Sequence, residues 1–282
     1  IRTDKLQLRK LVQESLDRLV RQNYVARNGD TYTFLTDDEQ DIEREIRNTP
    51  VDTAAVVQVI ATEVFGSLYF TKKFKYDKYD FPFDQMVDDT VFGQLTQSGM
   101  RLHLLTVASD SNKSEEELRM KTSHECEALL VLSEKYPYFE EFQNAEKIRK
   151  YVKSRNISQL PEAIRNIIQN KQQQASSYTT SAKEHLKQAI VEAKCYVYGE
   201  TVNMRATTIK EKFDGVLGLL VQNVYYKLGL VNYNFDSDDQ LYKLLAERAD
   251  GLALEGDNAM RNPEAVKEID DYLRMQNERV HT

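Results

Sequence analysis

The sequence predicts a mostly helical α+β fold, and three observations favour it. Apolar residues at helical spacing alternate with short runs of β-prone residues. No glycine lies between Gly99 and Gly199, and Pro161 is the only proline between Pro137 and Gly199, so this stretch can form long helices. We therefore expect a partial winged helix, then a small α/β layer with a long helical hairpin, in segments 1–50, 51–136 and 137–282.

The first predicted helix covers residues 4–23. Its apolar face consists of Leu8, Leu11, Val12, Leu16, Leu19 and Val20. Two β-prone runs follow at 24–27 and 31–35, and the Asn28-Gly29 pair between them is a strong hairpin signal because both turn residues need positive φ. A helix followed directly by a hairpin is the second half of a winged helix. Its first two helices are expected upstream of Ile1, as in a piece of a longer protein.

Thr36 and Glu39 have the spacing of a capping box and predict the start of another helix. A further helix is predicted over 52–65, and short strands over 68–70 and 74–76. Five aspartates then follow among aromatic residues: Asp77, Asp80, Asp84, Asp88 and Asp89. We expect them to be solvated loop carboxylates, because a calcium loop needs tighter oxygen spacing and a glycine at its bend.

The α/β layer is predicted from a strand at 100–108, a helix at 114–122 and a strand at 127–133. The last of these is continuously apolar, which is typical of a strand covered on both faces. His103 alternates with leucines in the first strand, so we expect a packed or surface histidine rather than a catalytic base.

The helical hairpin is predicted from a helix at 139–155 and a second one that begins near Ser158 and continues to Ala193. The second helix has one face with residues at steps of three and four: Ile164, Ile168, Lys171, Ala175, Tyr178, Ala182, His185, Leu186, Ala189 and Ala193. Residues 169–181 are nearly all polar. This helix is therefore expected to project from the body or to lie along one neighbour.

The remaining elements are a short strand or turn at 195–200 and a buried helix at 207–228. Gly215 and Gly218 in that helix would let a neighbour approach closely. Another helix is predicted at 239–249, a break at 251–256 and a last polar helix at 263–279.

Composition and motifs exclude several function classes. The formal net charge of −7 provides no global basic field for nucleic acid. We find no apolar run of membrane length and no signal peptide, so a cytoplasmic protein with two reduced, buried thiols, Cys126 and Cys195, is expected. The P-loop, Gly-x-Ser-x-Gly and His-Glu-x-x-His signatures are absent, and the four histidines are scattered. We therefore predict no catalytic, cofactor-binding or metal-binding residue in this chain.

DNA contact is the alternative that the predicted winged helix leaves open, because its third helix can enter the major groove. The candidate contacts with phosphates are Arg9, Arg18, Arg21 and Arg27. Two of these arginines lie four residues after an acid, Arg18 after Glu14 and Arg21 after Asp17, which is also the pattern of an ordinary solvated helix face.

Five stretches of the sequence, at 16–46, 127–134, 139–142, 193–200 and 223–228, occur in an order that resembles the BrxC/PglY family of bacterial BREX phage-defence systems. The resemblance implies a large P-loop protein whose ATP and Mg²⁺ site lies in an N-terminal AAA+-like module. No ATP-binding residue carries over to this chain, which has the character of an internal fragment.

The resemblance implies an antiviral ATPase that works with other BREX components on DNA. Our first hypothesis for this segment is a non-catalytic interaction or coupling role that relays nucleotide state or mediates assembly. The expected partners are other BREX components and, in a homo-oligomer, a second copy of the chain; no membrane is expected. The alternative is DNA contact through the helix and wing, and an uncharacterised enzyme is the least favoured class.

Overall fold

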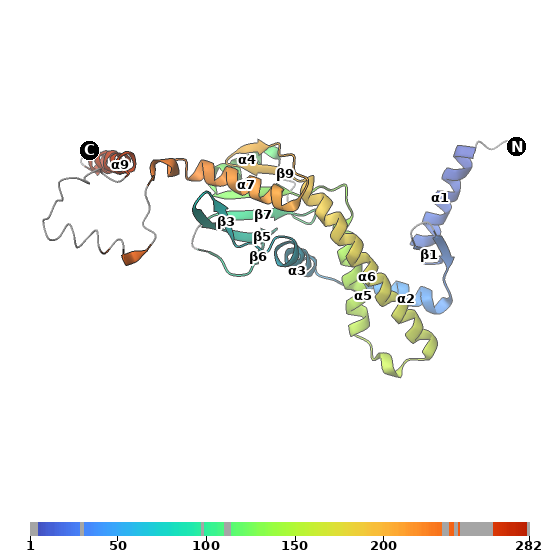
Figure 1. The fold of residues 1–282 in the computed structure, drawn as a ribbon. Coiled ribbons are helices and arrows are strands. Elements are labelled where there is room, and N and C mark those ends of the chain that lie inside the picture. The colour runs from blue at the N-terminus through green and yellow to red at the C-terminus, as the bar shows by residue number, and fades with distance from the viewer. Residues whose placement is uncertain are drawn as a thin grey trace. The chain divides into compact units, whose positions relative to one another are not determined.

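The structure is a computed structural model that describes residues 5–28, 31–96, 99–109, 114–232, 237–239, 242 and 262–280 (Figure 1). The chain divides into two compact units, residues 1–220 and 221–282. It is a mostly helical α+β protein, as the sequence predicts. The predicted segment boundaries at 50/51 and 136/137 stay predictions.

The N-terminal elements occur in the predicted order. They are α1 (Lys5–Arg21), β1 (Val25–Asn28), β2 (Thr31–Phe34) and α2 (Asp37–Asn48). β1 and β2 pair antiparallel, which confirms the hairpin, although Gly29 and Asp30 of its turn lie outside the described residues. The Thr36 side chain accepts a hydrogen bond from the Glu39 backbone N–H and the Glu39 side chain accepts one from Thr36, so the capping box is also confirmed. The remainder of a winged-helix fold stays a prediction.

A mixed six-stranded sheet forms the centre of the first unit, in the order β10-β9-β8-β7-β5-β6. Its strands are β5 (Asp84–Val87), β6 (Thr90–Phe92), β7 (Arg101–Leu105), β8 (Glu127–Val131), β9 (Lys194–Val197) and β10 (Glu200–Val202). The central strands β5, β7 and β8 are parallel, whereas β6 and β9 join them antiparallel. A separate hairpin consists of β3 (Lys73–Tyr76) and β4 (Tyr79–Pro82).

Helices pack on the sheet and bury its leucines. Helix α3 (Thr53–Glu63) packs against β5 and β6, and α4 (Glu115–His124) packs against β8, β9 and β10. Leu118 of α4 lies in a cluster with Leu105, Leu129 and Tyr196, which share one face of the sheet. The residues that alternate with them are also buried: Leu102, Leu104, Ala128 and Leu130. The strands at 101–105 and 127–131 are thus covered on both faces, as the continuously apolar sequence predicts for the second of them.

The predicted strand at 68–70 is wrong. A π-helical turn, Val64–Leu68, extends α3 instead, and Tyr69 is buried with its hydroxyl donating to Asp214 Oδ1 at 2.7 Å. The ring of Tyr69 packs edge-on against Phe213. The aromatic residues of this stretch have a local pattern typical of a strand, but tertiary packing determines their conformation.

The prediction of solvated loop carboxylates is wrong for two of the five aspartates, and a third, Asp80, is exposed but lies in β4 rather than in a loop. Asp84 lies in β5 and Asp88 in the tight turn before β6, and both are buried. Each carboxylate accepts backbone hydrogen bonds, Asp84 from Thr96 N at 2.5 Å and Asp88 from Thr106 N at 2.7 Å. Their burial is possible because these donors replace water. The two-cysteine prediction also needs a correction, since Cys195 is buried but Cys126 is exposed.

The helical hairpin consists of α5 (Tyr138–Lys153) and α6 (Glu162–Val191), which lie side by side (Figure 1). At 30 residues, α6 is about 45 Å long. The buried face of α6 is the one predicted, and the helix lies along its neighbour α5. Ser158 does not cap it: that residue sits in a separate 3-10 turn, Ile157–Gln159, and the helix begins after Pro161.

Helix α7 (Ile209–Val224) confirms most of the predicted helix at 207–228. Its two glycines face neighbours, because a Cβ on Gly215 would meet Met204 Sδ and one on Gly218 would lie 3.6 Å from Phe74 Cζ. In the second unit, α9 (Pro263–Val280) confirms the last predicted helix, and Lys227 forms an ion pair with Glu268. The predicted helix at 239–249 and break at 251–256 fall largely or wholly outside the described residues.

Candidate functional site

The four arginines proposed for DNA contact lie on the elements α1, β1, β2 and α2, which we call the N-terminal module of this chain. Arg9, Arg18 and Arg21 are on α1, Arg27 is on β1, and all four are exposed. Arg18 and Arg21 share the last turn of α1, whereas the Arg27 guanidinium lies over the Tyr32 ring at 5.6 Å. The structure therefore places these residues on one module and leaves their role a prediction.

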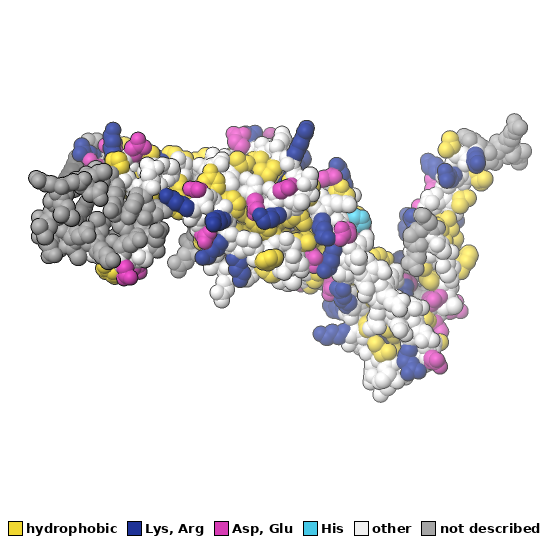
Figure 2. Space-filling view, in the orientation of Figure 1, with side chains coloured by type: hydrophobic (Ala, Val, Ile, Leu, Met, Phe, Trp, Pro, Cys, Tyr) yellow, Lys and Arg dark blue, Asp and Glu magenta, His cyan; other side chains and the backbone are white. Residues whose placement is uncertain are grey.

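The apolar face predicted for the first helix is only partly covered by the residues that the structure describes. No residue of α1 is buried, and Leu8, Leu11 and Val12 are about half exposed. Figure 2 shows hydrophobic and basic side chains together on this helix. Attachment of the N-terminal module to the following domain therefore depends on α2 rather than on α1.

Helix α2 packs into the helical hairpin through an apolar cluster that we call the α2–hairpin interface. Its buried members are Ile42, Ile46, Ala145, Ile148, Tyr151 and Ala175. The two isoleucines lie four residues apart, on one face of α2, and the other members come from α5 and α6. This spacing is visible in the sequence, but nothing in the sequence identifies the hairpin as the partner.

Charged groups surround this apolar cluster on both sides. Lys171 of α6, only 7% exposed, forms an ion pair with Glu43 of α2 and donates to Gln174 Oε1 at 3.1 Å. Glu45 accepts hydrogen bonds from the Tyr151 hydroxyl at 2.9 Å and from Arg155 at 2.5 Å. Helix α2 thus places Glu43 opposite α6 and Glu45 opposite α5.

Lysines of α5 bind backbone carbonyls at the end of α2. Lys147 Nζ donates to Arg47 O at 3.3 Å, and Lys150 Nζ donates to Pro50 O at 2.7 Å. The Arg47 side chain in turn donates to Arg21 O, the last carbonyl of α1, at 2.7 Å. Cations at these positions satisfy carbonyls that a helix C-terminus leaves without partners. They also connect α1, α2 and α5 in series, beside a cavity of about 460 Å³.

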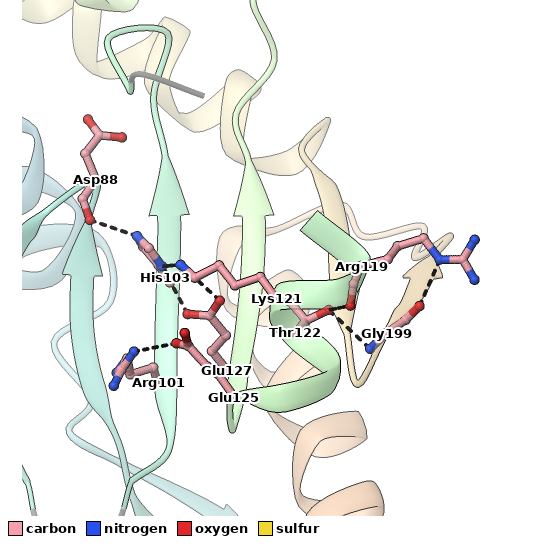
Figure 3. Close-up of polar contacts among 9 residues, drawn as sticks. All are labelled: Asp88, Arg101, His103, Arg119, Lys121, Thr122, Glu125, Glu127 and Gly199. Carbon is pink, nitrogen blue, oxygen red and sulfur yellow. Dashed lines mark hydrogen bonds and ion pairs between the residues drawn. The ribbon is translucent and has the colours of Figure 1, made fainter. Parts of the chain in front are cut away.

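A second polar cluster lies inside the sheet, beneath α4 (Figure 3). His103 Nε2 donates to the Asp88 carbonyl oxygen at 2.8 Å, and its Nδ1 lies 3.1 Å from Glu127 Oε2. Lys121 of α4 reaches the same carboxylate, with Nζ 3.2 Å from Oε1 in an ion pair without hydrogen-bond alignment. The Glu127 side chain is fully buried, so its charge depends on these two partners.

The protonation of this cluster follows from its surroundings. Burial by itself raises the pKa of the Glu127 carboxyl, but the hydrogen bond and charge of His103 together with Lys121 outweigh it and hold the pKa below its ordinary value. Burial raises the pKa of Asp88, which the hydrogen bonds from Thr106 only partly offset. His103 is therefore a packed histidine, as the strand pattern predicts, and it joins β7, β8 and the β5–β6 turn.

Figure 3 also shows how α4 binds the β9–β10 turn. Arg119 Nε donates to Gly199 O at 2.8 Å, and Gly199 N donates to Thr122 Oγ1 at 3.2 Å. Gly199 has φ of +78°, and a Cβ there would lie 3.1 Å from Ser123 Cβ. These contacts hold one helix on the sheet.

Within the described part of the chain, no group of three or more His, Cys, Asp or Glu side chains is arranged to hold a metal ion. No single described helix is both long and apolar enough to cross a membrane. One bent pair, Asp37–Asn48 with Thr53–Leu68, meets a length and composition test at an angle of 87°.

Comparison with known protein families identifies the family of the domain that contains the six-stranded sheet. Residues 49–220 match the sequence model of the family described as "BREX ATP-binding protein BrxC 4th domain with six-stranded beta sheet". The observed sheet has six strands, and all of them lie between residues 84 and 202. No solved structure matches the chain.

Proposed function

Because this chain belongs to the BrxC family of BREX ATP-binding proteins, we propose that it is a non-catalytic coupling segment of a phage-defence protein. In this proposal a change in the orientation of the preceding segment is transmitted to the six-stranded domain through the α5–α6 hairpin. Nucleotide binding belongs to another module of the protein, and other BREX components are the partners.

The α2–hairpin interface is the observation that carries this proposal. The family match begins at residue 49, immediately after α2, so Ile42 and Ile46 lie before the matched domain. Both nevertheless pack against α5 and α6, which lie within it. A preceding segment that is held by apolar packing, by the Glu43–Lys171 ion pair and by cations on helix carbonyls cannot reorient without moving the hairpin.

The hairpin has the length and continuity that such coupling requires. One face of α6 is buried near α2 at Lys171 and Ala175, and is buried again at Leu186, Ala189 and Ile190 near its other end. Ser133, just after β8, donates its backbone N–H to Ala189 O at 3.2 Å. An unbroken helix about 45 Å long thus joins the α2–hairpin interface to the residues that follow β8, an inner strand of the sheet.

A charge exchange across the interface tests the proposal. Glu43→Lys and Lys171→Glu each leave two like charges facing one another, which we expect to destabilise the interface by about 3 kcal/mol. The double variant restores an ion pair. We expect each single variant, introduced into the full-length protein, to reduce phage resistance of the host, and the double variant to restore most of it, measured as plating efficiency.

Lys187→Glu is the matched control, because Lys187 lies on the same helix in an exposed pair with Glu184. Hydrogen exchange of the 282-residue chain shows whether each single variant loosens α2. If α2 loosens and phage resistance stays at the wild-type level, coupling through this interface is excluded.

DNA contact is a second candidate, which the shared exposure of the four arginines on α1 and β1 favours. Here we expect the chain to bind duplex DNA with an affinity that falls steeply with salt and is lost when Arg18, Arg21 and Arg27 are replaced by Glu. Arg44→Glu is a control from an exposed pair on α2. A folded chain that does not bind DNA leaves only the coupling proposal.

A further inference from the structure

A second cavity lies in the six-stranded domain, away from the α2–hairpin interface. It has a volume of about 540 Å³ and is bounded by the end of α6, by β10 with the following residues 203–205, and by α7. This size is within the range of small-molecule sites in proteins. Its walls combine apolar side chains such as Val191 and Val202 with several cations.

Lys212 is the residue in this cavity that the fold leaves unexplained. It is 3% exposed, and its Nζ donates to Met204 O at 3.3 Å. No carboxylate within the described part of the chain pairs with it. Its other polar neighbour is the Cys195 thiol, whose pKa is raised by burial, so that sulfur does not supply the missing negative charge. A buried ammonium without a counter-charge is costly, and its presence indicates that an anion completes the site.

Two further cations line the same cavity. Lys194 and Arg205 are exposed at its rim, and neither has an ion pair with a described carboxylate. Of the two acids on the lining, Glu192 already pairs with Lys135 at 3.0 Å, and Glu115 accepts from Thr201 Oγ1 at 3.0 Å. Three cations thus face a space in which the negative charge is already partly compensated.

The position of Lys212 is built into the fold. The Met204 side chain lies so close to Gly215 that a Cβ there would overlap with Met204 Sδ. This approach holds residues 203–205 against α7, and the Met204 carbonyl fixes the Lys212 ammonium at the cavity wall. A residue placed by two such contacts is preorganised for a ligand rather than freely mobile.

We propose that this cavity binds a small molecule that carries a phosphate group, with Lys212 as the buried contact and Lys194 and Arg205 at the rim. A doubly charged, tetrahedral oxyanion suits several converging cations better than a single carboxylate does. The cavity exceeds the size of phosphate itself, so the rest of the molecule lies against the apolar wall.

Calorimetric titration of the 282-residue chain tests this assignment, with inorganic phosphate and glycerol 3-phosphate as probes and succinate as the carboxylate probe. Lys212→Met keeps an unbranched side chain, one atom shorter, and removes its charge. We expect this variant to weaken binding of both phosphate probes at least about tenfold, the effect of one lost charge-assisted hydrogen bond. Glycerol 3-phosphate is expected to bind more tightly than phosphate, and succinate more weakly than either.

Thermal unfolding provides a readout that does not depend on the choice of ester. In phosphate-free buffer we expect Lys212→Met to have a higher Tm than wild type, because an unpaired buried charge is gone. Phosphate is then expected to raise the wild-type Tm more than the variant Tm, relative to chloride at equal ionic strength. Lys187→Met, from an exposed pair on α6, is the control and should behave as wild type.

Equal effects of phosphate on wild type and Lys212→Met would overturn the proposal, since they would reflect general salt stabilisation. Binding of succinate without binding of either phosphate probe would also overturn it. If Lys212→Met does not fold, a double variant at the exposed rim, Lys194→Gln with Arg205→Gln, replaces it, and unchanged phosphate affinity in that variant has the same meaning.

Discussion

At the residue scale, the stability of the sheet depends on a charge that the sheet itself buries. Glu127→Gln removes the carboxylate that His103 and Lys121 face and leaves both partners without it. We expect a loss of about 3 kcal/mol in the free energy of unfolding at pH 7. Chemical denaturation of the two proteins measures this difference directly.

The same substitution has a pH dependence with a defined sign. The pKa of Glu127 in the folded protein is lower than its ordinary value of 4.5, so its contribution is complete above that value and is lost as the pH falls below it. The difference between wild type and Glu127→Gln should therefore shrink in acid. The pKa of Asp88 is raised, so its contribution to stability changes with pH in the opposite direction. The wild-type stability curve combines both groups, whereas the difference between wild type and Glu127→Gln reports on Glu127.

Lys187→Met, at an exposed pair on α6, is a suitable comparison and should change the unfolding free energy by less than about 0.5 kcal/mol at any pH. A constant difference between wild type and Glu127→Gln from pH 7 to pH 3 would contradict the ionised carboxylate. The sequence places Glu127 and His103 on neighbouring strands, but their pairing depends on the parallel register, in which Arg101 lies opposite Glu127. That register is not a local property.

At the scale of elements, the sequence predicts those whose patterns are long or whose caps are explicit. The buried face of α6 follows from spacing alone, and the capping box of Thr36 and Glu39 locates the start of α2. Three strands of the central sheet, β5, β6 and β10, are not predicted. The carboxylates of Asp84 and Asp88 are buried and accept hydrogen bonds from backbone N–H groups 12 and 18 residues away. Without knowledge of these donors, the sequence pattern predicts that an aspartate lies in a solvated loop.

The end of the sheet shows the same limit. The stretch 195–200 is predicted as a short strand or turn, whereas it forms a hairpin between β9 and β10 that α4 fixes through Arg119 and Thr122. Positive φ at both Tyr198 and Gly199 allows the tight turn. Sequence reasoning finds the turn residue, but the helix that selects this turn is about 80 residues away.

At the scale of the whole molecule, two of the hydrophobic clusters in the described part of the first unit share no members. The α2–hairpin interface is one cluster, and the sheet with α4 contains another. Stability need not be uniform across such a unit, because clusters with few shared members can open separately. The candidate sites follow this division, since coupling is proposed at the first cluster and phosphate binding is proposed in a cavity beside the sheet.

Ile46→Ala tests the independence of the two clusters. Ile46 is 6% exposed, and its truncation is expected to cost about 3 kcal/mol at the α2–hairpin interface. We expect backbone amides of α1, β1, β2 and α2 to exchange faster with deuterated solvent, by a factor of ten or more, about 1.4 kcal/mol. Amides of β7 and β8 should keep their wild-type rates, as measured by mass spectrometry on peptic fragments.

Leu129→Ala in the sheet is the converse variant, since Leu129 is fully buried in β8 and belongs to the cluster beneath α4. It should accelerate exchange in the sheet strands, and in α5 and α6 only as far as they depend on the sheet. If Ile46→Ala instead accelerates β7 and β8 as much as α2, the two clusters open together. The α5–α6 hairpin would then act as part of one cooperative body, and nucleotide-dependent motion of the preceding segment would have to displace the whole six-stranded domain rather than pivot on it.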